Sequence, residues 1–161
     1  MTVAEYNHSV DEYADRLFRF VVKSMRDEEA ARDVVQETFA KLWTKIADVS
    51  GEKVRSYLFT AAYHTMIDVI RKEKRKVDFE EVNAEDYSHD DQYTDLPEIV
   101  NAAIDKLPEL QRRIIILRDY EGYSYREIGE ITGHSESQIK VYIYRARMFL
   151  KKHIGSIQTV I

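Results

Sequence analysis

Apolar residues recur every three or four positions through most of the chain, which is the spacing of one face of an α-helix. Only five glycines and two prolines interrupt the pattern, so the sequence indicates an all-α protein. The second helix is predicted to bury Ala30, Val34, Val35, Phe39, Leu42, Trp43 and Ile46. Seven helices are predicted in all, over residues 5–26, 27–48, 54–76, 97–107, 109–120, 124–132 and 135–152.

The last two predicted helices carry clear end signals. Ser124 followed by Glu127, and Ser135 followed by Gln138, have the spacing of a capping box at a helix start. Gly133 lies between them and tolerates the positive φ that ends many helices. A short helix, a glycine corner and a longer helix are typical of a helix-turn-helix.

The outer face of the longer helix is basic. Ile139 and Ile143 point inward, while Lys140, Tyr144 and Arg147 share the opposite side. Gly129 in the shorter helix is expected to let a partner helix come close. These features favour DNA binding, and the alternative is a helical hairpin whose cations serve only solubility.

Charge divides the chain into three segments. Residues 1–76 carry a net +1, residues 77–98 carry nine acids and no lysine or arginine, and residues 99–161 carry a net +3. The overall charge of −5 therefore arises in one short stretch, and two cationic segments remain available for nucleic acid. We predict two small helical domains, 1–76 and 96–161, joined by a flexible acidic linker over 77–95.

The third predicted helix ends in six charged residues, five of them basic. One or two cations satisfy a helix dipole, so this run indicates a phosphate-binding surface, with a solvated helix end as the alternative. Tyr57, Phe59 and Tyr63 lie just upstream and would stack on unpaired bases if exposed, although core packing is favoured for Tyr57.

Other classes of protein are disfavoured by the composition. The chain has no cysteine, no apolar run long enough to span a membrane and no signal-peptide pattern, so we expect a cytoplasmic protein. Its five histidines are scattered, and no nucleophile–base pair or phosphate-binding glycine loop is present. We therefore expect neither a metal nor a cofactor, and no enzymatic activity.

Three strings resemble the sigma factors of bacterial transcription. Residues 33–43 resemble their core-polymerase-binding helix, and residues 55–72 resemble the helix of their promoter-melting region. Leu107-Pro108-Glu109, with residues 123–128 and 144–147, resembles their fourth conserved region. The resemblance covers nearly the whole chain, and the missing first and third regions match the small extracytoplasmic-function (ECF) group. It implies sigma region 2 over 1–76 and region 4 over 96–161.

The resemblance also implies roles for individual residues. Asp33, Gln36, Glu37 and Lys41 would bind core polymerase, the first three through the coiled coil of its clamp, and their spacing puts those three on one helix face. The loop over 50–55 and the helix after it would capture a flipped base of the minus-ten element. His64 departs from the asparagine of many relatives, which leaves the identity of that base open. The residues expected at the minus-ten element are Arg55, Tyr63, His64, Arg71, Lys72, Lys74, Arg75 and Lys76.

The second domain would read the minus-thirty-five element through Lys140, Val141, Tyr144, Arg145 and Arg147. By analogy, the linker would thread toward the active-site and RNA-exit channels of polymerase. The implied partners are core RNA polymerase, through its clamp coiled coil and its flap, and both double- and single-stranded promoter DNA. An anti-sigma factor is common in the family, and no membrane insertion is expected.

Two alternatives differ from a sigma factor in their partners. A stand-alone helix-turn-helix regulator would bind DNA without polymerase, and a helical adaptor would bind only protein. Neither needs the face formed by Asp33, Gln36 and Glu37.

Overall fold

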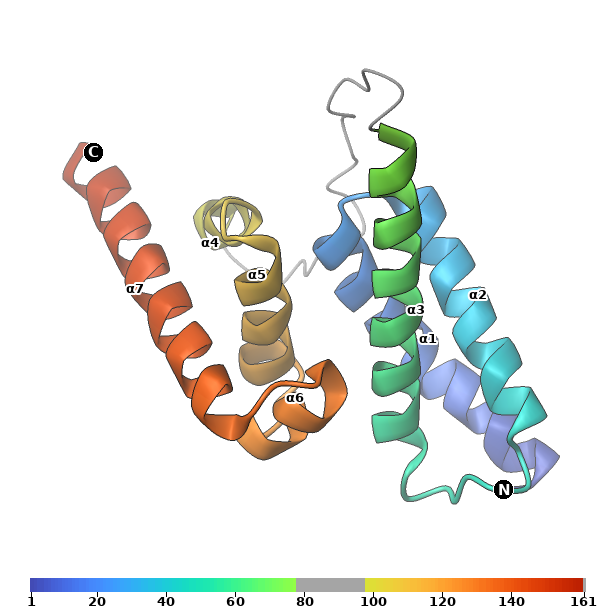
Figure 1. Ribbon diagram of the computed structural model, residues 1–161. Coiled ribbons are helices and arrows are strands. Elements are labelled where there is room, and N and C mark those ends of the chain that lie inside the picture. The colour runs from blue at the N-terminus through green and yellow to red at the C-terminus, as the bar shows by residue number, and fades with distance from the viewer. Residues whose placement is uncertain (78–97, 161) are drawn as a thin grey trace. The chain divides into compact units, whose positions relative to one another are not determined.

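A computed structural model describes residues 1–77 and 98–160 of the chain (Figure 1). Every regular element in these residues is a helix, as the sequence pattern predicts. The chain divides into two compact units, Met1–Asp91 and Gln92–Ile161. The predicted linker over 77–95, with Leu96 and Pro97, lies outside the described residues except for Val77, which is the last residue of a helix.

The first unit contains three long helices that pack against one another in all three pairs. Its core is formed by side chains with no exposed surface, among them Leu17, Phe20, Leu42 and Leu58. The rings of Phe20 and Phe59 lie 5.6 Å apart between centroids and join the first helix to the third. The three helices are α1 (Val3–Met25), α2 (Glu28–Thr44) and α3 (Val54–Val77).

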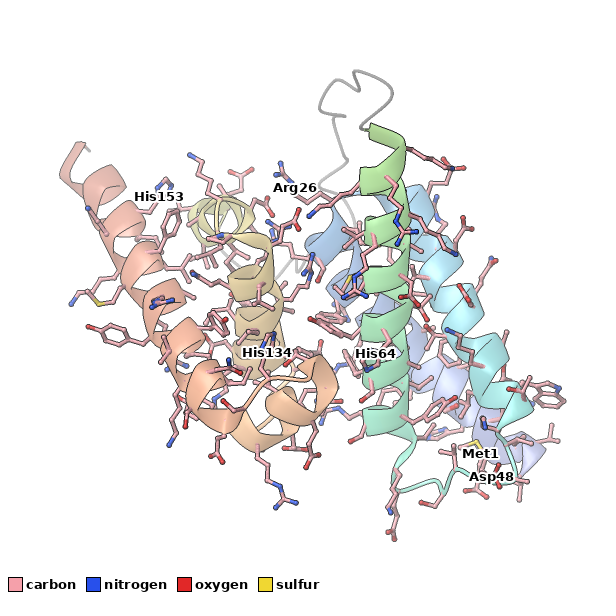
Figure 2. All side chains as sticks on the ribbon, in the orientation of Figure 1. Met1, Arg26, Asp48, His64, His134 and His153 are labelled. Carbon is pink, nitrogen blue, oxygen red and sulfur yellow. The ribbon has the colours of Figure 1, made fainter. Side chains whose placement is uncertain are left out.

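Local capping sets the starts of the first two helices. Thr2 forms a capping box with Glu5, so α1 begins two residues earlier than predicted. Asp27 accepts a hydrogen bond from the backbone N–H of Ala30 and caps α2. Arg26, labelled in Figure 2, has a φ of 59° and makes the sharp turn between the two helices.

Trp43 differs from the prediction. It was expected in the core of the first unit, but 49% of its surface is exposed. The preceding residue, Leu42, occupies the core position of that turn and is fully buried. Trp43 lies at the edge of the buried stripe of α2, and its ring stands edge-on to Tyr6 of α1 at 5.0 Å.

The second unit is organised around its last helix, against which the other three α-helices of the unit pack. The predicted helix over 109–120 is divided, because its final residues form a π-helix in which the N–H of Glu121 donates to the carbonyl of Ile116 over 3.1 Å. The last helix, predicted to end at residue 152, continues to Val160. The elements are α4 (Glu98–Asp105), α5 (Glu109–Ile115), η1 (Ile116–Tyr120), α6 (Tyr125–Thr132) and α7 (Glu136–Val160).

The corner between α6 and α7 forms as its sequence predicts. Ser124 and Glu127 make a complete capping box, and Gly133 ends α6 with a φ of 81°. At the start of α7, Ser135 and Gln138 exchange hydrogen bonds of 2.9 and 3.2 Å. These contacts fix the entry and exit of the corner.

Gly129 permits the tight return of the chain at this corner. A Cβ atom at this position would lie 2.6 Å from the backbone carbonyl oxygen of His134. The predicted close approach at Gly129 is therefore made by the corner itself, with His134 at its centre (Figure 2). Only glycine fits here without a shift of the backbone.

Replacing Gly129 by alanine should destabilise the second unit by about 1–3 kcal/mol, since backbone atoms must move to admit the methyl group. Amide hydrogen exchange in α6 and α7 measures this loss within the full chain. Gly155→Ala is the matched control, because nothing lies within 4 Å of a Cβ at that position. Equal protection in Gly129→Ala and the parent would contradict the explanation.

Candidate functional site

The outer face of α2 presents an acidic and polar surface. Asp33, Gln36 and Glu37 are all exposed, at the i, i+3 and i+4 positions that share one side of a helix. The inward side of α2 carries Val34 and Leu42, both buried. Burial of that stripe holds the three polar side chains outward.

Lys41 is engaged within the first unit. Its Nζ donates a hydrogen bond of 2.7 Å to Oγ1 of Thr65 on α3, and it lies 3.6 Å from a carboxylate oxygen of Glu37. Thr65 is buried, so the contact ties α2 to α3. Lys41 therefore joins the exposed face of α2 to the body of the unit.

The loop between α2 and α3 separates two hollows. One has a volume of about 850 Å³ and is lined by the first turns of α1 together with Ser50, Gly51, Glu52 and Val54, and its acids are Glu5, Glu12 and Glu52. The other has a volume of about 580 Å³, and the charged residues in its lining are one lysine and one aspartate. Its lining is Asp48, Val49, Lys53, Ser56, Tyr57, Thr60 and Ala61.

Two neighbouring residues of α3 have opposite environments. His64 is exposed on the surface of the helix (Figure 2). Tyr63 is only 6% exposed, so it lacks the exposure on which its predicted stacking on unpaired bases depends. The reason is helical phase, because Tyr63 lies one turn from both Phe59 and Met66 of the core. The ring of Tyr63 meets His64 edge-on at 5.8 Å.

The C-terminal end of α3 is a dense positive surface. Arg71, Lys72, Lys74, Arg75 and Lys76 are all exposed, with Glu73 as the one acid among them. Arg55, at the other end of the helix, is half-buried. Cationic groups are thus concentrated over the last two turns of α3.

The first half of α7 presents a mixed basic and apolar face. Lys140 and Arg145 are exposed, and so are Val141 and Tyr144, with 44% and 66% of their surfaces accessible. Val141 and Arg145 also line a shallow hollow with Ser137, Gln138 and Tyr142. Exposed side chains on a helix of this kind can contact base edges in the major groove of DNA.

Arg147, a member of the predicted set on α7, is paired with an acidic side chain. Its Nη2 lies 2.7 Å from Oδ1 of Asp119, and this hydrogen bond raises the pKa of Arg147. Asp119 belongs to the π-helix η1, in which Arg118 donates a hydrogen bond to the carbonyl of Tyr123. Periodicity did not single out Asp119, because the pair joins elements 28 residues apart.

In the part of the chain that the structure describes, no group of three or more histidine or acidic side chains is arranged to hold a metal ion. Within the same residues no helix is both long and apolar enough to cross a membrane.

Comparison with known proteins identifies both units. Residues 10–76 match the family Sigma-70 region 2, and residues 98–150 match the family Sigma-70, region 4. The chain is 30% identical to the RNA polymerase sigma factor YlaC of Bacillus subtilis over 153 residues, covering 89% of this chain and 88% of that protein. It is 29% identical to SigV of the same organism, covering 88% and 86% of the two chains.

The chain belongs to the ECF sigma factors. A solved structure of the sigma factor RpoE from Bartonella quintana, in complex with the anti-sigma factor NepR, is similar over 95% of this chain and 98% of that one, with a TM-score of 0.82 and 28% identity. As an ECF sigma factor, the chain binds core RNA polymerase and promoter DNA and directs transcription initiation from specific promoters.

If Arg147 lies at promoter phosphates, Asp119 competes with DNA for it. Asp119→Asn should then strengthen binding of upstream-element DNA by the sigma–polymerase complex. The slope of log affinity against log salt should steepen by about 0.9, the value for one added phosphate contact. Glu130→Gln is the charge-matched control, because Glu130 pairs with Arg126 and not with Arg147. Equal slopes for the two variants would contradict this role of Asp119.

Proposed function

We propose that this ECF sigma factor holds core polymerase through the outer face of α2. The proposal is supported by the exposure of Asp33, Gln36 and Glu37 on one side of the helix. Their acidic character suits a basic partner surface, such as the clamp coiled coil implied by the family resemblance. Lys41 contributes by fixing this face to α3 through Thr65.

We propose that the smaller hollow beside the loop receives the flipped base of the minus-ten element. It is lined by Lys53 and the half-buried Tyr57, which can attract a phosphate and stack on a base. The larger hollow is lined by Glu5, Glu12 and Glu52, and these acids would repel DNA. His64 is the exposed residue of the pair on α3 and is proposed to approach the promoter first. Tyr63 reaches a base only if its ring leaves the core.

The basic end of α3 is proposed to hold phosphates near the melted segment. Its exposed cations, Arg71, Lys72, Lys74, Arg75 and Lys76, exceed what the helix dipole requires. Arg55 is assigned to the same DNA at the start of the helix. Contacts of this kind give affinity without sequence preference.

The second unit is proposed to read the minus-thirty-five element in the major groove through α7. Lys140, Val141, Tyr144 and Arg145 are exposed on that helix after the α6–α7 corner, which is the position of a recognition helix. Arg147 would contact the same element once its guanidinium leaves Asp119 and binds a phosphate.

Domain limits of 1–76 and 96–161, with a linker over 77–95, complete the proposal. A tether lets the two units bind one promoter together and raises the effective concentration of the second after the first has bound. The nine acids in residues 77–98 would keep this segment away from DNA and let it occupy a positively charged channel of polymerase.

We further propose that the chain works in the cytoplasm as a binding protein without catalytic activity. The free-energy cost of strand opening would be offset by base capture and stacking, since the sequence has no group suited to nucleotide hydrolysis. The related RpoE is bound by the anti-sigma factor NepR, and an anti-sigma factor is proposed as a partner here too. A stand-alone regulator is not favoured, because the relatives are sigma factors.

The exposure of Asp33, Gln36 and Glu37 carries the proposal, and their joint replacement by alanine tests it. The triple variant should lose binding to purified core polymerase and run-off transcription from a genomic template library. Its helix content should be unchanged, because the three side chains lie outside the core. Core binding at parental strength would overturn the assignment of this face.

Arg145→Ala should weaken binding of the upstream element by about 1–3 kcal/mol if Arg145 contacts a base edge. The preference of the variant protein for one base pair at a single promoter position should weaken at the same time. Lys140→Ala provides the comparison, since a lysine on phosphate loses affinity uniformly across sequences. Competition binding with single-position promoter variants measures both quantities. A uniform loss for Arg145→Ala would place that residue on phosphate.

A further inference from the structure

The loop that links α2 to α3 meets the first turns of α1. The larger hollow shows this proximity, because the start of α1 and the loop residues Ser50, Gly51 and Glu52 line it together. Figure 1 shows the N-terminal end of α1 beside this loop. The smaller hollow, proposed to receive the flipped base, is lined by residues of the same loop and of α3. The start of α1 and the proposed base site therefore share one loop.

Gly51 lies against a carboxylate of α1. A Cβ atom at this position would lie 2.7 Å from Oε2 of Glu5, which is closer than nonbonded carbon and oxygen atoms approach. Among the described residues the glycines with a positive φ are Gly122 and Gly133, so the backbone conformation of Gly51 does not call for glycine. The nearby carboxylate of Glu5 is what leaves no room for a side chain.

The side chain of Glu5 is held in place by the start of α1. Its Oε1 accepts a hydrogen bond of 3.1 Å from the backbone N–H of Thr2, and the N–H of Glu5 donates to Oγ1 of Thr2 over the same distance. The hydrogen bond from the backbone of Thr2 is the main cause of a lowered pKa at Glu5, so this carboxylate is ionised at neutral pH. One carboxylate oxygen thus caps the helix while the other faces Gly51.

We propose that Glu5 is a positioning residue for capture of the flipped base. Its carboxylate, fixed by Thr2, sets the position of the loop at Gly51. Neither Glu5 nor Gly51 lines the smaller hollow, so the effect passes through the loop residues that do. The inference rests on the proposed function of that hollow and adds a residue of α1 to it.

Hydrogen bonds within the loop connect Gly51 to the base site. The N–H of Lys53 donates to the carbonyl of Ser50 over 3.0 Å, which closes a turn around Gly51. The N–H of Val49 donates to the carbonyl of Lys45 over 3.1 Å, and the side chain of Val49 is buried. Val49 and Lys53 both line the smaller hollow. Because binding groups must be held within about 0.5 Å of their working geometry, a small shift at Gly51 is enough to impair capture.

Binding of single-stranded DNA by the sigma–polymerase complex tests the inference. The probes are non-template-strand oligonucleotides of a minus-ten element found by run-off transcription, either intact or with one base at a time removed to leave an abasic site. The parent complex should bind the intact strand roughly fivefold or more tightly than the strand that lacks the captured base, as stacking of one base predicts. Gly51→Ala should reduce this ratio toward one, because the methyl group displaces the loop. Affinity for the abasic strand should stay parental, since the phosphate contacts of α3 are untouched.

Substitutions of Glu5 separate positioning from general stability. Glu5→Ala should also reduce the ratio, whereas Glu5→Gln should restore most of it, because glutamine keeps the shape and an oxygen that accepts from Thr2. Combining Glu5→Ala with Gly51→Ala should add little further loss, since the contact is already disrupted. A parental ratio in Gly51→Ala or in Glu5→Ala would overturn the inference. An equal loss of affinity for intact and abasic strands leaves the ratio parental and overturns it too.

Glu12→Gln is the matched control. Glu12 lines the same hollow, but its carboxylate lies 3.2 Å from Nε2 of His8, so its ratio should be parental. Circular dichroism and core binding should be parental in every variant. If Gly51→Ala does not fold, the comparison of Glu5→Ala with Glu5→Gln decides alone.

The outcomes separate this inference from the function on which it rests. If the parent complex binds the intact strand and every abasic strand equally, base capture itself is contradicted, and the role of Glu5 is contradicted with it. If the parent prefers the intact strand and the variants prefer it equally, the role of Glu5 alone is contradicted.

Discussion

Burial of one apolar stripe per helix in a small core is the constraint on which both units depend. In the first unit Leu17, Phe20, Leu42 and Leu58 have no exposed surface and account for the inward sides of all three helices. A three-helix bundle of this size has no second layer, so the opposite side of every helix faces outward. The polar face of α2 and the basic end of α3 are therefore consequences of the core, and substitutions on them should leave the fold intact.

The second unit depends on the same burial and on a tight corner. Ile139 and Ile143 hold α7 against the unit, and Gly129 admits the carbonyl of His134. Together these contacts fix the angle between α6 and α7, so that α7, the helix proposed to read DNA, is held rigidly. A rigid recognition element loses little entropy on binding, which helps a unit with few side chains available for contact.

The sequence predicts the features that depend on neighbouring residues in the chain. The capping boxes at Ser124 and Ser135 and the left-handed Gly133 are local, and the structure confirms them. Trp43 was misplaced because it lies at the edge of the buried stripe of α2, where a small rotation of the helix exchanges inside and outside. Its environment is decided by the packing of α1 against α2, which periodicity does not contain.

Long-range polar contacts could not be predicted from the sequence for a related reason. The pair formed by Asp119 and Arg147 requires the π-helix that turns Asp119 toward α7, and nothing in the local pattern marks a π-helix. The contact of Lys41 with Thr65 is equally distant in sequence. The family resemblance suggested which residues bind, and the structure adds which of them are already engaged.

The pairing of Arg147 also bears on how molecules of this protein are distributed in a cell. A genome offers on the order of a million or more unspecific sites, and every unpaired cation increases retention on them. A guanidinium already held by a carboxylate at 2.7 Å gains less from a random phosphate than a solvated one does. Fewer molecules of the sigma factor are then held at unspecific chromosomal sites, and more remain free to bind polymerase.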